Sequence, residues 1–142
     1  YIAKYFEAYP NVKEYMNSNV EFARKNGYVS TLLGRKRYIP EINSSNFNLR
    51  SFGERAAMNM PLQGTAADII KIAMLKVYNK FKELGFKSKL ILQVHDELIV
   101  DAHPDEVEKV LEILKNEMQT AVTLSVPLTV ETECGERWFD AK

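Results

Sequence analysis

The sequence predicts an α+β fold in which an antiparallel sheet packs against several helices. Two apolar, largely β-branched runs within residues 90–100 stand on either side of a polar stretch, a pattern typical of two strands joined at a bend. Apolar residues recur at helical spacing before and after this pair. We therefore expect a palm-type sheet made of a central hairpin at about 88–101 and a C-terminal strand at about 127–133, with a small separate hairpin at about 28–39.

Two helices are expected at the start of the chain, of which residues 1–9 form the tail of the first. The first ends near Pro10, because a proline disfavours the helical conformation of the residue before it. Asn11 is then the expected N-cap of a second helix that reaches about Asn26, with Gly27 as its C-terminal stop. The small hairpin follows, with Gly34 between its two β-rich segments.

Two further helices precede the central hairpin. The first runs from about Phe47 to Met60 and is expected to be interrupted at Pro61. The second starts with small residues at Gly64 and stops at Gly85. Beyond the hairpin, a proline opens an amphipathic helix with core positions at Val107, Val110, Leu111, Leu114 and Met118.

The bend of the central hairpin carries His95 and Asp96, and a second carboxylate, Glu97, follows directly. A desolvated, unpaired carboxylate is strongly disfavoured, so two carboxylates beside an apolar ladder call for a partner, and a divalent cation is the obvious one. The alternative is a solvated turn, in which Asp96 bonds its own backbone and Glu97 is the first outward residue of the second strand.

Three polar residues are spaced four apart and share one helix side if the helix resumes coaxially after the proline. They are Arg55, Asn59 and Gln63. Their side chains suit base edges, sugars and phosphates. The same row also fits the ordinary polar face of a helix.

The small hairpin carries a basic cluster, Arg35, Lys36 and Arg37, which can grip phosphates or stay solvated. Residues 1–87 hold 14 Lys and Arg against 7 Asp and Glu, whereas residues 88–142 hold 5 against 12. The basic half is expected to contact a polyanion, and the carboxylates of the acidic half are expected to bind metal or to be solvated. The alternative is that helix surfaces merely differ in charge.

Length and composition indicate one globular domain of 142 residues, with no apolar run long enough to span a bilayer. A single cysteine, Cys134, excludes an internal disulfide and fits a reducing, intracellular setting. The chain opens at Tyr1 without a starting Met or a signal peptide pattern, so we expect a piece of a longer protein.

Four strings carry a resemblance to a known family: TLLGRKRYIPEI, SFGERAAMNMPLQGTAADIIKIAM, LILQVHDELIVDA and VPLTVETECGERWFDAK. In this order, and over essentially the whole chain, they resemble the C-terminal part of family A DNA polymerases, the bacterial DNA polymerase I type. QVHDE resembles the third polymerase motif of that family. The resemblance implies a single fragment, residues 1–142, of the palm with adjoining helices.

The resemblance also implies roles for the residues of the bend and the helical row. Asp96 matches one of two aspartates that hold the two catalytic Mg²⁺ ions, Glu97 an acidic residue with an assisting role, and His95 a residue close to the primer 3′ end. The residues that match contacts to template and primer, largely through the minor groove, are Arg55, Asn59 and Gln63.

The implied partners are primer-template DNA, deoxynucleoside triphosphates and an upstream polymerase region that carries the other aspartate and the triphosphate-binding helix. The implied enzyme is a bacterial, cytoplasmic, nucleoid-associated DNA-directed DNA polymerase, and the isolated chain is expected to be inactive. Two alternatives stay open from the residues alone: a non-catalytic duplex-binding module and a structural α+β domain.

Overall fold

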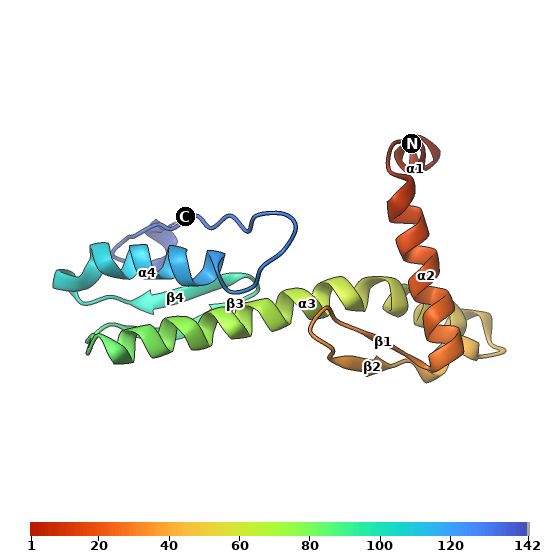
Figure 1. The fold of residues 1–142 in the computed structure, drawn as a ribbon, viewed down its shortest axis with the longest axis horizontal. Coiled ribbons are helices and arrows are strands. Elements are labelled where there is room, and N and C mark those ends of the chain that lie inside the picture. Colours follow the sequence, from red (N-terminus) through yellow and green to blue (C-terminus); the bar gives the residue numbers. More distant parts are fainter. Residues whose placement is uncertain (142) are drawn as a thin grey trace. The chain divides into compact units, whose positions relative to one another are not determined.

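The structure is a computed structural model that describes residues 1–141. The described chain contains four α-helices and two separate two-stranded antiparallel sheets (Figure 1), which confirms the predicted α+β class. It divides into two compact units, Tyr1–Ala66 and Ala67–Lys142, and the long helix α3 (Phe47–Glu83) passes from the first into the second.

The first unit begins with α1 (Ile2–Ala8) and α2 (Pro10–Asn26). The expected N-cap at Asn11 is wrong, because Pro10 is already the first helical residue and Tyr9 precedes it as the cap. Proline suits this position since its φ is preset and its absent N–H would have no helical partner. Gly27 ends α2 in the left-handed conformation, with φ 77°, as predicted.

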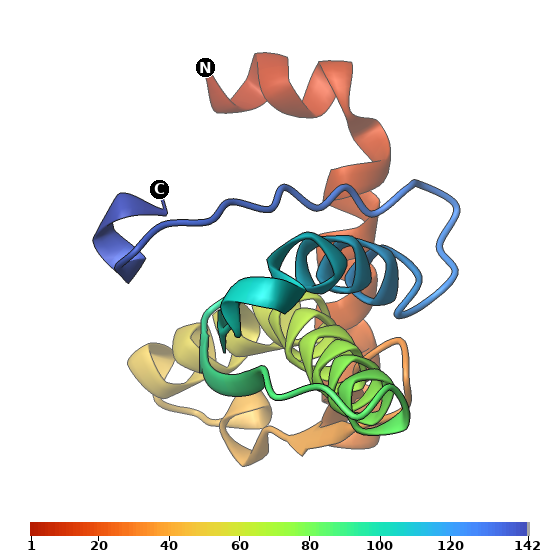
Figure 2. The same ribbon diagram turned by 90° about the vertical axis from the view of Figure 1, so that its left-hand side faces the viewer.

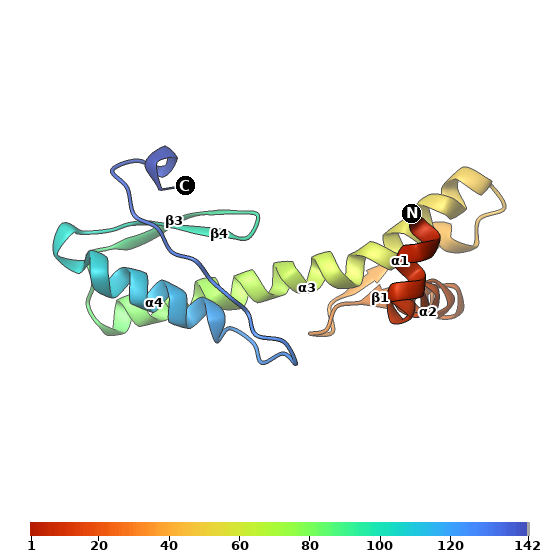
Figure 3. The same ribbon diagram turned by 90° about the horizontal axis from the view of Figure 1, so that it is seen from above.

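The small hairpin consists of β1 (Tyr28–Ser30) and β2 (Lys36–Tyr38), followed by a short 3₁₀ helix, η1 (Pro40–Asn43). Figure 3 shows the hairpin, in orange, alongside the first part of α3. Gly34 lies in its turn with φ 87°, a conformation that favours glycine. Burial of apolar side chains from α2, the hairpin, η1 and α3 forms the core of this unit, which comprises Ala23, Val29, Ile39, Ile42, Ala57 and Met60.

Helix α3 is continuous over 37 residues, so the expected break at Pro61 is wrong. A proline inside a helix removes one backbone donor and crowds the carbonyl one turn earlier, and packing can outweigh this cost. Pro61 is buried and lies next to the buried core residue Met60. The helix start is capped by Asn46, whose Oδ1 accepts the backbone N–H of Asn48 at 2.9 Å.

The second unit holds the central hairpin, β3 (Lys89–Val94) and β4 (Glu97–Asp101), with an irregularity in the ladder between Leu90 and Leu92. The 3₁₀ helix η2 (Pro104–Glu106) then leads into α4 (Val107–Gln119). Figure 2 shows α4 next to α3, and the buried side chains between them are Val77, Phe81, Val110 and Leu114. Two of the core positions predicted for this helix, Val110 and Leu114, are thereby confirmed.

The expected C-terminal strand at about 127–133 is wrong, because residues 121–137 form no strand in the described structure. Burial does alternate there: Leu128, Val130 and Thr132 are half-buried between exposed neighbours. Alternation predicts which side chains turn inward, but a strand is defined by backbone hydrogen bonds to a neighbouring strand, and this segment is paired with none in the described structure. Finally, none of the helices among the described residues is both long enough and apolar enough to cross a bilayer.

Candidate functional site

The bend of the central hairpin is a two-residue connection made by His95 and Asp96. Val94 pairs with Glu97 as the last pair of the ladder. His95 has φ 52°, the left-handed region that is uncommon for residues other than glycine but enriched for histidine. The amide Nε2 of Gln93 donates to the carbonyl oxygen of His95 at 2.6 Å and thereby braces this backbone.

The carboxylates of Asp96, in the bend, and of Glu97, the first residue of β4, lie in solvent, and His95 is exposed as well. This exposure agrees with the solvated-turn alternative, in which Glu97 is the first outward residue of the second strand, and not with carboxylates desolvated by an apolar ladder. The carboxylate oxygens of Asp96 and Glu97 are therefore accessible to a cation, and folding itself does not remove these charges from water.

The donor set of the bend fits a hard cation only in part. No group of three or more His, Cys, Asp or Glu among residues 1–141 is placed to hold a metal ion. Mg²⁺ prefers oxygen ligands, retains several waters and needs one or two carboxylates together with substrate phosphates. Asp96 and Glu97 supply such carboxylates, so this chain can contribute a share of a magnesium site.

A clamp at the other end of the hairpin fixes the strands that carry the bend. The Glu106 carboxylate accepts the Ser88 hydroxyl at 2.6 Å and the backbone N–H groups of Ser88 and Lys87 at 2.9 and 3.0 Å. The Ser88 hydroxyl oxygen in turn accepts the His103 N–H at 2.9 Å. The bond from the Ser88 hydroxyl, followed by that from the Lys87 N–H, lowers the pKa of Glu106 from 4.5 to about 2.

The predicted polar row lies in the first unit, exposed on the continuous helix α3, and consists of Arg55, Asn59 and Gln63. Because the helix continues through Pro61, the three residues share one face of a single helix, and no second helix has to resume along the same axis. The Arg55 guanidinium donates from Nη1 to Ser51 Oγ at 2.8 Å, one turn earlier on the same face. The row therefore presents donors and acceptors to solvent in a fixed order along one helix.

The basic cluster of the small hairpin is also exposed, but its members differ in their surroundings. Lys36 lies over the ring of Tyr28, with Nζ 4.4 Å from the ring centroid. Arg37 shares a hairpin face with Val29, its paired residue. Arg35 belongs to the turn that contacts α3, where Leu32 N–H donates to Thr65 Oγ1 at 2.9 Å.

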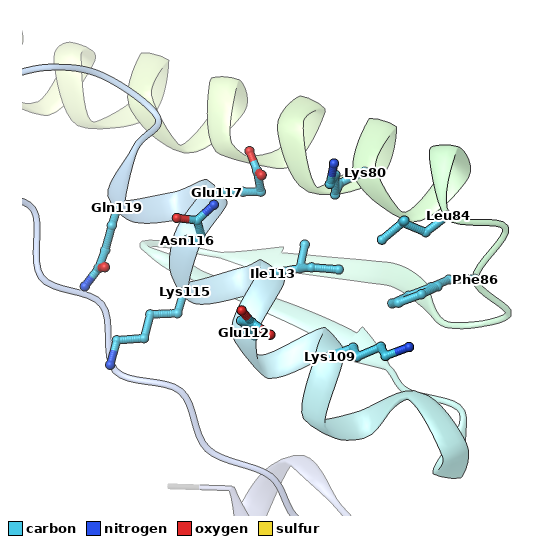
Figure 4. Close-up of a pocket in the computed structure, with 10 residues that line it drawn as sticks. All are labelled: Lys80, Leu84, Phe86, Lys109, Glu112, Ile113, Lys115, Asn116, Glu117 and Gln119. Atoms are coloured by element: carbon cyan, nitrogen blue, oxygen red, sulfur yellow. The ribbon is translucent and has the colours of Figure 1, made fainter.

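A separate open pocket of about 670 Å³ lies in the second unit, between the end of α3 and α4 (Figure 4). Leu84, Phe86 and Ile113 face one another at its base, whereas Lys115 and Gln119 point away. None of the residues predicted for the bend, the helical row or the basic cluster lines it. The pocket therefore plays no part in the candidate site.

Comparison with known proteins gives matches over the length of the chain. The family model of DNA polymerase family A matches residues 1–140. The chain is 58% identical over 142 residues to DNA polymerase I of Caldicellulosiruptor bescii and 50% identical to that of Geobacillus stearothermophilus, all of the chain being covered in both cases. It spans only 17% and 16% of the lengths of these relatives.

A solved structure is similar in both fold and sequence. It is the POL domain of Pol1 from M. smegmatis in complex with DNA primer-template and dNTP, with a TM-score of 0.96 and 44% identity. The alignment covers 99% of this chain and 25% of that one.

Proposed function

The chain belongs to DNA polymerase family A, and on that basis we propose that it is part of a DNA-directed DNA polymerase that adds deoxynucleotides to a primer 3′ end. The observation that carries the proposal is the exposed, braced bend with Asp96, in a chain related to DNA polymerases I over its whole length. The proposed partners are primer-template DNA, deoxynucleoside triphosphates and an upstream polymerase region. The proposed setting is the bacterial cytoplasm, and the proposed roles are DNA replication and repair.

Asp96 is the proposed metal ligand of this chain. Polymerases of this family depend on metal ions, and the exposed oxygens of Asp96 and Glu97 suit Mg²⁺. When bound, two Mg²⁺ ions would stabilise the charge on the attacking and leaving oxygens of an in-line displacement. Gln93 braces the backbone of the bend that carries Asp96, and His95 is proposed to lie close to the primer 3′ end.

The helical row is proposed to check base-pair geometry. The minor groove presents nearly the same acceptors for every correct pair, so donors that reach them can sense pair shape without reading sequence. Arg55, Asn59 and Gln63 offer such donors from one exposed face. Arg35 and Arg37 on the small hairpin are proposed to contact phosphates, which position a duplex without specifying its sequence.

The chain alone is proposed to bind duplex DNA but not to extend it. Two-metal catalysis needs more carboxylate ligands than this bend offers, and the described residues provide no cluster of three. Primer extension by the isolated 142-residue chain, with contaminating polymerase excluded, would contradict this part of the proposal.

The experiment uses a hybrid polymerase, in which this chain replaces the corresponding 58% identical segment of the Caldicellulosiruptor bescii enzyme. Asp96→Ala in the hybrid is expected to abolish primer extension and to leave affinity for primer-template duplex intact. Asp101→Ala is the matched control, because Asp101 is an exposed aspartate at the far end of the same hairpin. Near-normal extension by Asp96→Ala would remove the proposed metal role.

A further inference from the structure

Three aromatic side chains contact one another where α2 leads into the small hairpin (Figure 1). The rings of Phe22 and Tyr28 meet edge to face, with centroids 5.6 Å apart and planes at 86°. Tyr28 pairs with Tyr38 across the two strands, and the centroids of their rings are 5.7 Å apart. Tyr28 is therefore the middle residue of an aromatic cluster that comprises Phe22, Tyr28 and Tyr38.

The cluster stands on a buried backbone but is itself largely open to solvent. The residues that follow Tyr28 and Tyr38 along the chain, Val29 and Ile39, are each only 1% exposed and belong to the core of the first unit. In contrast, Tyr38 is 70% exposed and Phe22 is 44% exposed. The core thus holds the chain in place beneath the cluster, while the two outer rings present aromatic surface to solvent.

A lysine brings positive charge to the rings. Lys36 lies two residues before Tyr38 in β2, so the two side chains share one face of the hairpin. Its Nζ lies 4.4 Å from the centroid of the Tyr28 ring, within the range of a cation–π contact. Because Lys36 is exposed, its ammonium group is accessible to an anion beside the cluster.

The segment that contains the cluster is basic throughout. Residues 22–38 hold five Lys and Arg and no Asp or Glu. Arg24 is paired with Glu54 of α3, but Lys25 is exposed about one turn after Phe22 on α2. A ligand that complements this segment therefore carries negative charge as well as flat surfaces that stack on aromatic rings.

Single-stranded DNA has both properties. Its unpaired bases stack on exposed aromatic side chains with little regard to sequence, and its phosphates follow Lys and Arg. The bases of a duplex are already stacked on one another, so they are not available to the rings. A cross-strand pair such as Tyr28 and Tyr38 also stabilises a hairpin, but that role needs neither a third ring on α2 nor a Tyr38 that is mostly exposed.

We propose that the aromatic cluster and Lys36 bind single-stranded DNA, with unpaired bases stacked on Tyr38 and Phe22 and a backbone phosphate at Lys36. In the proposed polymerase this ligand is the unpaired part of the template strand, and for that choice the inference rests on the proposed function. The contacts are independent of sequence, as copying of any template requires.

The test uses the hybrid polymerase and primer-template DNAs that share one duplex but differ in the unpaired template. One DNA has an overhang of a single nucleotide, and the other has an overhang longer than about 16 nucleotides, the upper end of common single-strand site sizes. The dissociation constant of each DNA is measured by fluorescence anisotropy over a range of salt concentrations. The ratio of the two constants reports the contribution of the unpaired strand.

Loss of the outer ring is the central perturbation. Tyr38→Leu is expected to weaken binding of the long overhang about fivefold or more, the effect of one base–aromatic stack, and to leave binding of the short overhang unchanged. Phe22→Leu should act in the same way from α2. Tyr38→Phe retains the ring and should retain the affinity. Tyr78→Leu is the matched control, because Tyr78 is 57% exposed but lies outside the cluster.

An abasic overhang separates stacking from charge. It keeps the phosphates and removes the bases, so Tyr38→Leu should not change its affinity. Lys36→Gln should make the slope of log affinity against log salt shallower by about 0.7 with either long overhang, the value for one phosphate of a single strand.

Equal losses in Tyr38→Leu with the natural and the abasic overhang would overturn the inference. Equal losses with the short and the long overhang, accompanied by a lower melting temperature, would also overturn it and would assign Tyr38 to hairpin stability. If the unsubstituted hybrid extends primers but binds both overhangs with the same affinity, the single-strand site fails while the proposed function stands. If the hybrid extends no primer but binds a single-stranded oligonucleotide through Tyr38, the proposed function fails and the site stands.

Discussion

Replacing Glu106 with glutamine tests whether the stability of the clamp at the base of the central hairpin depends on the negative charge of the carboxylate. The carboxylate accepts three bonds, from the Ser88 hydroxyl and from the N–H groups of Ser88 and Lys87. An amide of the same shape keeps one acceptor oxygen and turns an NH₂ group toward a donor. We therefore expect Glu106→Gln to unfold more easily than the wild-type chain at neutral pH.

The pH dependence follows from the lowered pKa of Glu106. The pKa is about 2 in the folded chain against an ordinary value of 4.5, because the Ser88 hydroxyl and the Lys87 N–H favour the charged form. The stabilisation is thus fully present above pH 4.5 and is lost as the pH falls through the folded value of about 2. Between these two pKa values Glu106 is mostly protonated in the unfolded chain and mostly charged in the folded chain, so unfolding takes up protons at this residue.

The assay is urea unfolding of the full chain between about pH 2.5 and 6. The difference in free energy of unfolding between wild type and Glu106→Gln should be constant above about pH 5 and should shrink toward pH 2. Glu112→Gln is the matched control, because Glu112 is exposed on α4 and should keep the wild-type pH dependence. Parallel curves for wild type and Glu106→Gln would refute the argument that the clamp depends on charge.

Three further predictions concern the scaffold and the helical row. Gly53→Ala should destabilise the chain in thermal unfolding by about 1–3 kcal/mol, because the new Cβ would lie 2.9 Å from the Ile42 backbone nitrogen and only about 1 kcal/mol of helix propensity offsets the clash. Val77→Ala, at a fully buried site of the second unit, should cost about 2 kcal/mol in urea unfolding. In the hybrid polymerase, Gln63→Ala and Arg55→Ala should lower the extension rate or fidelity more than the melting temperature, and the opposite outcome would make the row structural.

The elements determined by nearby residues were predictable from the sequence. Gly27 and Gly34 lie in the left-handed conformations that their places at a helix end and a turn suggested. The central hairpin closes over a two-residue bend at His95 and Asp96, as the switch between apolar and polar residues indicated. In each case the signal and the structure that it specifies lie within a few residues of one another.

The errors arose where a distant partner decides the structure. Proline usually interrupts a helix, but Pro61 is buried and packing keeps α3 intact through it. Residues 127–133 alternate as a strand does, yet the sheet of the central hairpin has only two strands in the described structure. Periodicity indicates which face of a segment is buried, but it does not indicate whether another strand pairs with the segment's backbone.

The side chains that support the candidate site were missed for the same reason. Glu106 is 18 residues from Ser88, and Thr65 is 33 residues from Leu32. Both are ordinary polar residues in the sequence, without a spacing that signals a clamp. Gln93 is the exception. Its long amide side chain lies two residues before His95 in a tight hairpin and can therefore reach the His95 backbone, a contact that the spacing in the sequence could have predicted.

The exposure of the bend shapes what this chain can contribute to a polymerase. An exposed carboxylate binds a cation weakly by itself, since water screens the attraction, so the affinity of the proposed site must come largely from further carboxylates and substrate phosphates. What the hairpin can supply is a braced backbone from which the Asp96 side chain projects. The two-residue connection sets the positive φ of His95, the Gln93 bond braces the backbone at this end of the strands, and the Glu106 clamp anchors their other end. Loss of either brace should therefore reduce the precision with which Asp96 is presented, while leaving its charge and its exposure unchanged.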